Sequence, residues 1–139
     1  MIVLDTSVLY ALLDRREPRH PDVSVWYRSC SDGLVTTPLV LAEIDYLVTK
    51  RLGAAAAAAV RRDIAAEAYD VEWWPEAATT MAEIAERHAD SGLSLTDASL
   101  LALADRLDTT RIATFDERHF RAVRPHGGAG AFTLLPLDA

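Results

Sequence analysis

The chain has 139 residues, of which 50% are hydrophobic, and a net charge of −7 at pH 7. This length and composition predict one domain, residues 1–139, with a buried core. The acidic balance argues against a protein that binds duplex DNA without sequence preference, and the single cysteine, Cys30, excludes an intramolecular disulfide.

Apolar runs and helical segments alternate in the first half of the chain. Residues Ile2–Leu4 predict a short strand. Thr6 or Ser7 is the expected cap of the helix that follows it. Thr37 and Pro38 are typical of a helix start. The predicted elements, in order, are a strand over 2–4, a helix over 8–13, a helix over 20–31, a strand over 34–36, a helix over 38–52 and an Ala-rich helix over 54–68.

The same alternation continues in the second half. Ser94 and Asp97 have the spacing of a capping box, which predicts a helix start. The elements expected here are a strand over 71–74, helices over 76–89 and 94–107, a strand over 111–115, a helix over 117–123 and a strand over 132–135. Strands that alternate with helices predict an α/β sandwich, with a central, mostly parallel sheet flanked by helices.

Acidic residues gather where this sheet would bind a ligand. Ligands of open parallel sheets lie beyond the carboxyl ends of the strands. Asp5 and Asp116 each follow a predicted strand, and Glu43 and Asp97 lie on helices that lead to the same edge. The helix of Glu43 is apolar on all sides, so periodicity alone does not separate Glu43 from Asp45.

Four carboxylates in one place need a counter-charge. At about 6 Å and an effective dielectric constant of about 20, each pair repels by roughly 3 kcal/mol. Such a cluster must bind a cation or take up protons. Oxygen ligands favour Mg²⁺ or Mn²⁺ over zinc. No serine–histidine, cysteine–histidine or glycine-rich phosphate motif competes, and the histidines show no ligand spacing: His20, His88, His119 and His126.

Four segments of the chain resemble, in order and spacing, the acidic blocks of PIN-domain ribonucleases. They are MIVLDTS, PLVLAEIDYL, LSLTDASLLALA and RIATFDERHF. The greatest likeness is to the VapC toxins of bacterial VapBC toxin–antitoxin modules. The resemblance implies a PIN-like α/β/α sandwich and selects Glu43 over Asp45. It implies that the catalytic, metal-binding acids are Asp5, Glu43, Asp97 and Asp116.

The resemblance also implies an activity and partners. By analogy, Thr6, Ser7 and Thr114 hold the carboxylates or a water. The family implies cleavage of structured RNA, such as a tRNA or a ribosomal RNA loop, with Mg²⁺ as cofactor and Mn²⁺ as a substitute. It further implies inhibition by a VapB-type antitoxin and a homodimer.

Basic residues follow two of the acids. Arg15, Arg16 and Arg19 come after the first predicted helix, and Arg118, His119, Arg121 and Arg124 come after Asp116. They are candidates for contact with RNA phosphates or with the antitoxin, Arg15, Arg16, Arg118 and Arg121 above all. The alternative is ordinary surface charge. Asp14, at a predicted helix end, is expected to be solvated.

Two other functions compete with the nuclease. A phosphatase of the haloacid-dehalogenase type needs a second Asp two residues after the first, and Ser7 stands there. A catalytically inactive PIN-like module that binds RNA or protein would be favoured if one acid were missing.

The longest apolar stretch, Ala54–Val60, is too short to span a membrane, which takes about 20 residues. We therefore expect a cytoplasmic protein with no membrane contact.

Overall fold

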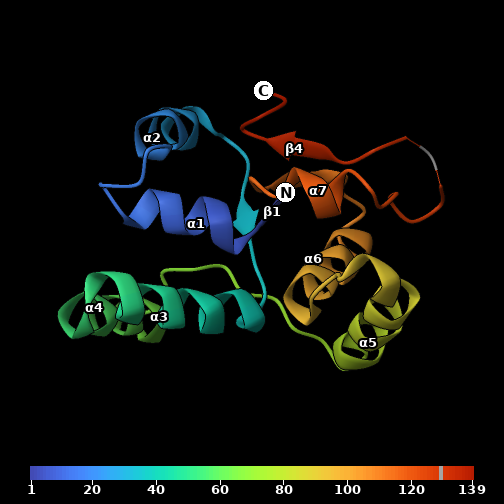
Figure 1. The fold of residues 1–139 in the computed structure, drawn as a ribbon, viewed down its shortest axis with the longest axis horizontal. Helices are drawn as coiled ribbons and strands as arrows, with labels where there is room; N and C mark the ends of the chain where they lie inside the picture. The colour runs from blue at the N-terminus through green and yellow to red at the C-terminus, as the bar shows by residue number, and fades with distance from the viewer. Residues whose placement is uncertain (129) are drawn as a thin grey trace.

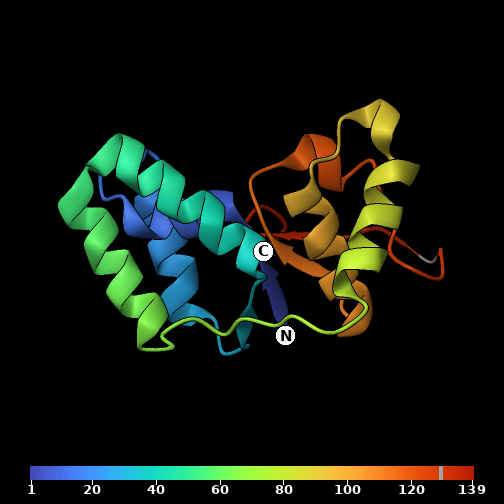
Figure 2. The same cartoon turned by 90° about the horizontal axis from the view of Figure 1, so that it is seen from below.

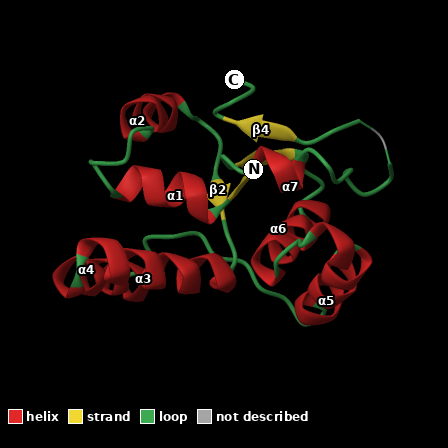
Figure 3. Ribbon diagram, in the orientation of Figure 1, coloured by secondary structure: helices red, strands yellow, loops and turns green. Residues whose placement is uncertain are grey.

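A computed structural model describes residues 1–128 and 130–139 of the chain. At its centre lies a sheet of four short strands: β1 (Ile2–Leu4), β2 (Leu34–Val35), β3 (Arg111–Ala113) and β4 (Thr133–Leu135). Their order is β2-β1-β3-β4, and every neighbouring pair is parallel. Figure 3 shows the strands in yellow between the helices. The carboxyl ends of all four strands therefore point to one edge, where ligands of such sheets bind.

Helices cover both sides of this sheet (Figures 1 and 2). On one side lie α1 (Thr6–Leu13), α2 (His20–Ser29), α3 (Pro38–Leu52) and α4 (Ala54–Ala65). On the other side lie α5 (Ala77–Arg87) and α6 (Leu95–Arg106), joined by a single 3₁₀ turn, η1 (Ala89–Ser91). The short helix α7 (Glu117–Phe120) follows β3. The predicted α/β/α sandwich is confirmed.

The hydrophobic core joins the sheet to the helices that pack on it. Most strand residues are apolar and buried, as a parallel sheet between two helical layers requires, and only the first residues of β2, β3 and β4 are partly exposed. Helix α6 packs against β1 and α5, and α1 packs against α2 and α3. The largest fully buried side chains include Phe120, Ile2, Ile44, Leu100, Leu103, Ile112 and Leu134.

The strand predicted over residues 71–74 is wrong. Only one bridge forms there, between Thr36 and Val71. The N–H of Thr36 donates to the carbonyl of Asp70, and the N–H of Glu72 donates to the carbonyl of Thr36. Beyond this point Trp74 turns into the core, with the Arg106 guanidinium 4.9 Å from its ring centroid. Burial of this large ring overrides the strand preference of the sequence.

Several elements end earlier than the sequence predicts. The second helix ends at Ser29, α4 at Ala65 and α7 at Phe120. Strand β3 ends at Ala113, although the N–H of Thr114 still donates to the carbonyl of Leu135 in β4 at 3.0 Å. After Thr114 the backbone leaves the ladder, because the N–H of Phe115 donates to Ser7 Oγ and the N–H of Asp116 donates to Thr114 Oγ1.

Candidate active site

Asp5 begins the site, directly after β1. Its N–H donates to the carbonyl of Ala113, 2.9 Å away, so the strand ladder fixes its backbone. Its Oδ1 accepts the N–H of Thr6 at 2.7 Å, and Asp5 is the N-cap of α1. The prediction that Thr6 or Ser7 caps this helix is wrong, because Asp is an equally good N-cap and the helix starts one residue earlier.

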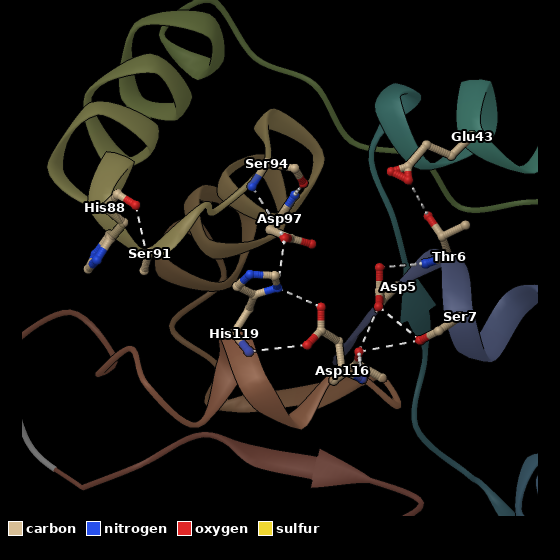
Figure 4. Close-up of polar contacts among 11 residues, drawn as sticks. Asp5, Thr6, Ser7, Glu43, His88, Ser91, Ser94, Asp97, Asp116 and His119 are labelled. Carbon is tan, nitrogen blue, oxygen red and sulfur yellow. Dashed lines mark hydrogen bonds and ion pairs between the residues drawn. The ribbon is translucent and has the colours of Figure 1, made fainter.

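The hydroxyls near Asp5 hold its carboxylate in place (Figure 4). The Oδ2 atom of Asp5 accepts hydrogen bonds from Ser7 Oγ at 2.9 Å and from Thr114 Oγ1 at 2.6 Å. These two hydroxyls accept in turn: Ser7 from the N–H of Phe115 at 3.0 Å, and Thr114 from the N–H of Asp116 at 2.9 Å. This network ties the end of β1 to the segment after β3.

Glu43 reaches the same place from the second turn of α3. Thr6 Oγ1 donates to its Oε2 over 3.3 Å. Asp45, the other candidate on this helix, pairs instead with Arg61 of α4, whose Nε lies 2.6 Å from its Oδ1. Asp45 therefore fastens α3 to α4, whereas Glu43 joins the acidic group.

Asp97 comes from the first turn of α6, where the predicted capping box is confirmed. Its N–H donates to Ser94 Oγ at 3.1 Å, and its Oδ2 accepts the N–H of Ser94 at 3.4 Å. The buried hydroxyls of Ser99 and Thr37 lie 2.8 Å apart and connect α6 to the start of α3. The helices that carry Asp97 and Glu43 are thus held in a fixed relation.

Asp116 caps α7 and pairs with His119, which the sequence offered only as a candidate contact for RNA or the antitoxin. Its Oδ1 accepts the N–H of His119 at 3.1 Å, and its Oδ2 lies 2.8 Å from His119 Nδ1. The same nitrogen lies 3.7 Å from Asp97 Oδ2. Carboxylates only accept hydrogen bonds, so His119 Nδ1 carries a proton here. The spacing of Asp116 and His119, three residues apart at a helix start, is the signal that could have found this pair.

The four acids line one open cleft of about 460 Å³. Other side chains along its walls are Glu17, Arg19, Arg51 and Phe115. In Figure 4, Asp5 stands between Glu43 on one side and the group of Asp97, Asp116 and His119 on the other. The structure therefore brings together acids from four segments that are distant in the sequence.

The electrostatics of the cleft favour a cation. Burial raises the pKa of Asp5 above its ordinary value, against the hydrogen bonds from Thr114 and Ser7 that lower it. Burial also raises the pKa of Asp97, and the hydrogen bond to Asp116 raises the pKa of His119. The fold thus disfavours the negative charges that it concentrates, and a bound cation would reverse this penalty.

Ligand atoms are close enough to share an ion. One atom each of Asp97, Asp116 and His119 lies within 4.8 Å of the others. Carboxylate oxygens suit Mg²⁺ and Mn²⁺, and His119, whose Nδ1 proton points to Asp116, would orient this carboxylate for the ion. The donor set therefore fits a divalent cation.

The four arginines predicted to contact RNA or the antitoxin differ in exposure and in ion pairing. Arg15 and Arg118 are exposed. The Nε atom of Arg16 lies 3.7 Å from Asp14 Oδ1. Arg121 is held by ion pairs with Glu117 and Asp138, at 2.9 and 2.7 Å. None of these four arginines is among the residues that line the cleft.

Asp14 is buried, so the expectation that it is solvated is wrong. Its Oδ2 accepts a hydrogen bond from the hydroxyl of Tyr10 at 2.7 Å, and its Oδ1 accepts one from the N–H of Arg16 at 2.9 Å.

The sequence did not single out Arg51, which lies in the cleft wall over the Tyr10 ring. Arg51 comes eight residues after Glu43 on α3, with Leu47 between them, so the three share one face of the helix, and this spacing is the signal that could have found it.

Comparison with known proteins identifies the family. The PIN domain family profile matches residues 2–124. The chain is 42% identical to Ribonuclease VapC26 of Mycobacterium tuberculosis (strain ATCC 25618 / H37Rv) over 136 residues, which cover 97% of this chain and 100% of that protein.

Solved structures agree in fold. Mycobacterium tuberculosis VapC20, described as a sarcin–ricin loop cleaving toxin, superposes with a TM-score of 0.75 at 26% identity, over 84% of this chain and 90% of that one. FitAcB from Neisseria gonorrhoeae superposes with a TM-score of 0.61 at 21% identity, over 84% and 88% of the two chains, which shows the fold alone. By its sequence and its fold, the chain belongs to the PIN-domain family and, within it, to the VapC proteins.

Proposed function

We propose that this protein is a divalent-metal-dependent endoribonuclease, the toxin of a type II toxin–antitoxin module. The observation that carries the proposal is the convergence of Asp5, Glu43, Asp97 and Asp116 in one cleft. Two of the four, Asp5 and Asp97, are buried, and a buried carboxylate is costly for a fold unless it binds an opposite charge. The names of the relatives VapC26 and VapC20 support RNA as the substrate.

The four acids would hold Mg²⁺, with Mn²⁺ as a substitute, as catalytic and metal-binding residues. When bound, the cation supplies the positive charge that activates a water, orients a phosphodiester and stabilises the departing oxygen. His119 stands beside Asp97 and Asp116 and orients the carboxylate of Asp116 through its Nδ1 proton.

The chain's own hydrogen bonds prepare the site. Ser7 and Thr114 fix both the position and the rotation of the Asp5 carboxylate. Thr6 does the same for Glu43 with a longer bond. Because these donors are in place before a substrate arrives, little reorganisation is needed when charge develops at the phosphate.

The substrate that fits best is an RNA with an exposed loop. Bases in loops are unstacked, so a phosphodiester there can enter an open cleft, whereas a duplex buries its bases. VapC20 is described as cleaving such a loop. We propose a tRNA or ribosomal RNA loop for this chain, a VapB-type antitoxin as its inhibitor, a homodimer as its assembly and the cytoplasm as its location. None of the helices in the described part of the chain is long and apolar enough to cross a membrane.

Cleavage of total RNA by the purified protein tests the proposal. We expect discrete products with Mg²⁺ or Mn²⁺, none with EDTA, and none from the Asp5→Asn variant. Asp45→Asn is the matched control, since it removes an acid from the same helix as Glu43 but outside the cleft, and it should cleave as the wild type does. RNA that is bound but never cut, with either metal, would instead support the inactive binding module.

A further inference from the structure

Two arginines line the cleft, and each lies on an aromatic ring. The guanidinium carbon of Arg19, just before α2, is 4.3 Å from the centroid of the Phe115 ring. The guanidinium carbon of Arg51, in the last turn of α3, is 5.0 Å from the centroid of the Tyr10 ring. Phe115 directly precedes Asp116 in the chain, so the Arg19 guanidinium lies close to the acids.

Neither guanidinium is used by a carboxylate within the described part of the chain. The arginines that do form ion pairs there are Arg16, Arg61, Arg106, Arg111 and Arg121. Glu17, which also lines the cleft, accepts the backbone N–H of Arg19 and not its side chain. The positive charges in the cleft wall are therefore available to a ligand.

A guanidinium on an aromatic ring is well suited to hold a phosphate. The ring contacts the flat face of the guanidinium and restricts its motion, while the N–H groups at its edge stay free to donate. Those donors match two oxygens of a phosphate. The Tyr10 ring is itself fixed, because its hydroxyl donates to Asp14 at 2.7 Å. The buried Asp14 therefore has a structural role, which is to fix the ring on which Arg51 lies.

We propose that Arg19 and Arg51 form a phosphate-binding wall, which holds the RNA strand on either side of the bond that the four acids address. The proposal rests on the proposed nuclease function and adds to it the groups that position the substrate. Without such a wall, the carboxylates of the cleft would repel the phosphates of RNA in a protein of net charge −7. Phosphate contacts of this kind set position and not sequence, so they serve any loop.

The proposed phosphate-binding wall is tested by measuring RNA binding to a variant that cannot cleave RNA. The probe is a fluorescently labelled stem–loop RNA, and the host is the Asp5→Asn variant with Mg²⁺ at low salt. Arg19→Gln and Arg51→Gln should each weaken binding about tenfold, which corresponds to about 1.4 kcal/mol. Each should also reduce the slope of log affinity against log salt by about 0.7, the value for one contact to a single strand. Arg62→Gln, an exposed arginine of α4 outside the cleft, is the matched control and should leave both unchanged.

Kinetics separate positioning from structure. In the otherwise wild-type protein, Arg19→Gln and Arg51→Gln should raise KM about tenfold and leave kcat within about twofold, as a loss of uniform substrate binding does. Arg19→Lys keeps the charge but loses the flat stack on Phe115, so its KM should lie between that of the wild type and that of Arg19→Gln. The rise in Tm on addition of Mn²⁺ should match that of the wild type in every arginine variant.

The outcomes are distinct for the wall and for the nuclease. If the arginine variants bind RNA as the Arg62→Gln control does, the wall is not an RNA site, and an acidic segment of a protein partner becomes its ligand. If the arginine variants lose the Mn²⁺-induced rise in Tm, the substitutions disturb metal binding by the four acids, and this result also overturns the proposal. If the wild type binds RNA through these arginines but never cleaves it, the wall stands and the nuclease function falls.

Discussion

Asp5 shows how one residue can serve both the fold and the site. It directly follows β1, caps α1 and accepts hydrogen bonds from the hydroxyls of Ser7 and Thr114. Asn is as good an N-cap as Asp, but its amide NH₂ only donates and so cannot accept the hydroxyl protons of Ser7 and Thr114 as Oδ2 does. Asn also lacks the negative charge, which burial disfavours here. The charge of Asp5 is therefore retained at the expense of stability, as is common in active sites.

The Asp5→Asn variant should make this visible. Without divalent metal, at neutral pH and with EDTA, we expect its free energy of unfolding to exceed that of the wild type by about 0.5–2 kcal/mol, because a buried charge and its repulsion by Asp97 are removed. Urea unfolding followed by circular dichroism measures the difference. A variant less stable than the wild type under these conditions would mean that the hydrogen bonds outweigh the charge.

Tyr10 and Asp14 predict a pH dependence. The hydrogen bond from Tyr10 holds the pKa of Asp14 below its ordinary value. A carboxyl with a lowered pKa in the folded state stabilises the fold above its ordinary pKa and loses this contribution as pH falls through the lowered value. Tyr10→Phe should therefore unfold at a lower urea concentration at pH 7.

The difference between Tyr10→Phe and the wild type should shrink as the pH falls below the ordinary pKa of Asp14 and through its lowered value in the folded protein, where Asp14 becomes protonated in both. Tyr27→Phe is the control, because Tyr27 is exposed on α2. A destabilisation of Tyr10→Phe that stays constant over the whole acid range would show that the lost hydroxyl acts through packing and not through Asp14.

At the scale of elements, α6 links stability to the site. Its first turn holds Asp97 through the capping box, and its body fills the core with Leu100 and Leu103. The same Oδ2 atom of Asp97 accepts the N–H of Ser94 and faces His119. A loss of the cap should therefore loosen an acid of the cleft as well as the start of a helix.

Ser94→Ala tests this coupling. Loss of the cap should lower the free energy of unfolding by about 1 kcal/mol and weaken the binding of Mn²⁺, measured by electron paramagnetic resonance of the free ion. Ser94→Thr should restore both, because Thr also caps. Ser91→Ala is the control, since Ser91 is exposed and its hydroxyl donates to the carbonyl of His88. Normal Mn²⁺ binding by a destabilised Ser94→Ala would show that Asp97 does not depend on its cap.

At the scale of the whole molecule, the four acids join segments from both ends of the chain. Asp5 lies after the first strand and Asp116 after the third, and a hydrogen bond from Thr114 connects the two segments. The site is complete only when the sheet, α3 and α6 are assembled. A cation bound there stabilises the folded state and not the unfolded chain.

Metal addition should therefore raise the Tm. At a Mg²⁺ or Mn²⁺ concentration of about 100 times Kd, the stabilisation is about 2.7 kcal/mol, or about 10 °C for a domain of this size. Differential scanning calorimetry with EDTA and with each metal measures it. Asp5→Asn and Asp116→Asn should lose most of the rise, and Asp45→Asn should keep it. An equal rise in all of them would place the metal outside the cleft.

The sequence by itself determined the features that depend on neighbouring residues. The alternation of strands and helices, the Ser94–Asp97 capping box and the acids after β1 and β3 are encoded within a few residues each. The topology rule for parallel sheets then predicted where these acids meet. The preference for Glu43 over Asp45 came only from the family resemblance, because the two have similar apolar neighbours along the helix.

Tertiary structure decided the features that depend on contacts between distant segments. The partner of Asp45 is Arg61 on the next helix, the ring under Arg19 is Phe115, and the ring under Arg51 is Tyr10. The strand expected over 71–74 gave way to burial of Trp74. Local preferences amount to fractions of a kcal/mol per residue, whereas burial of one large side chain amounts to about 1.5–3 kcal/mol, so packing prevails wherever the two conflict.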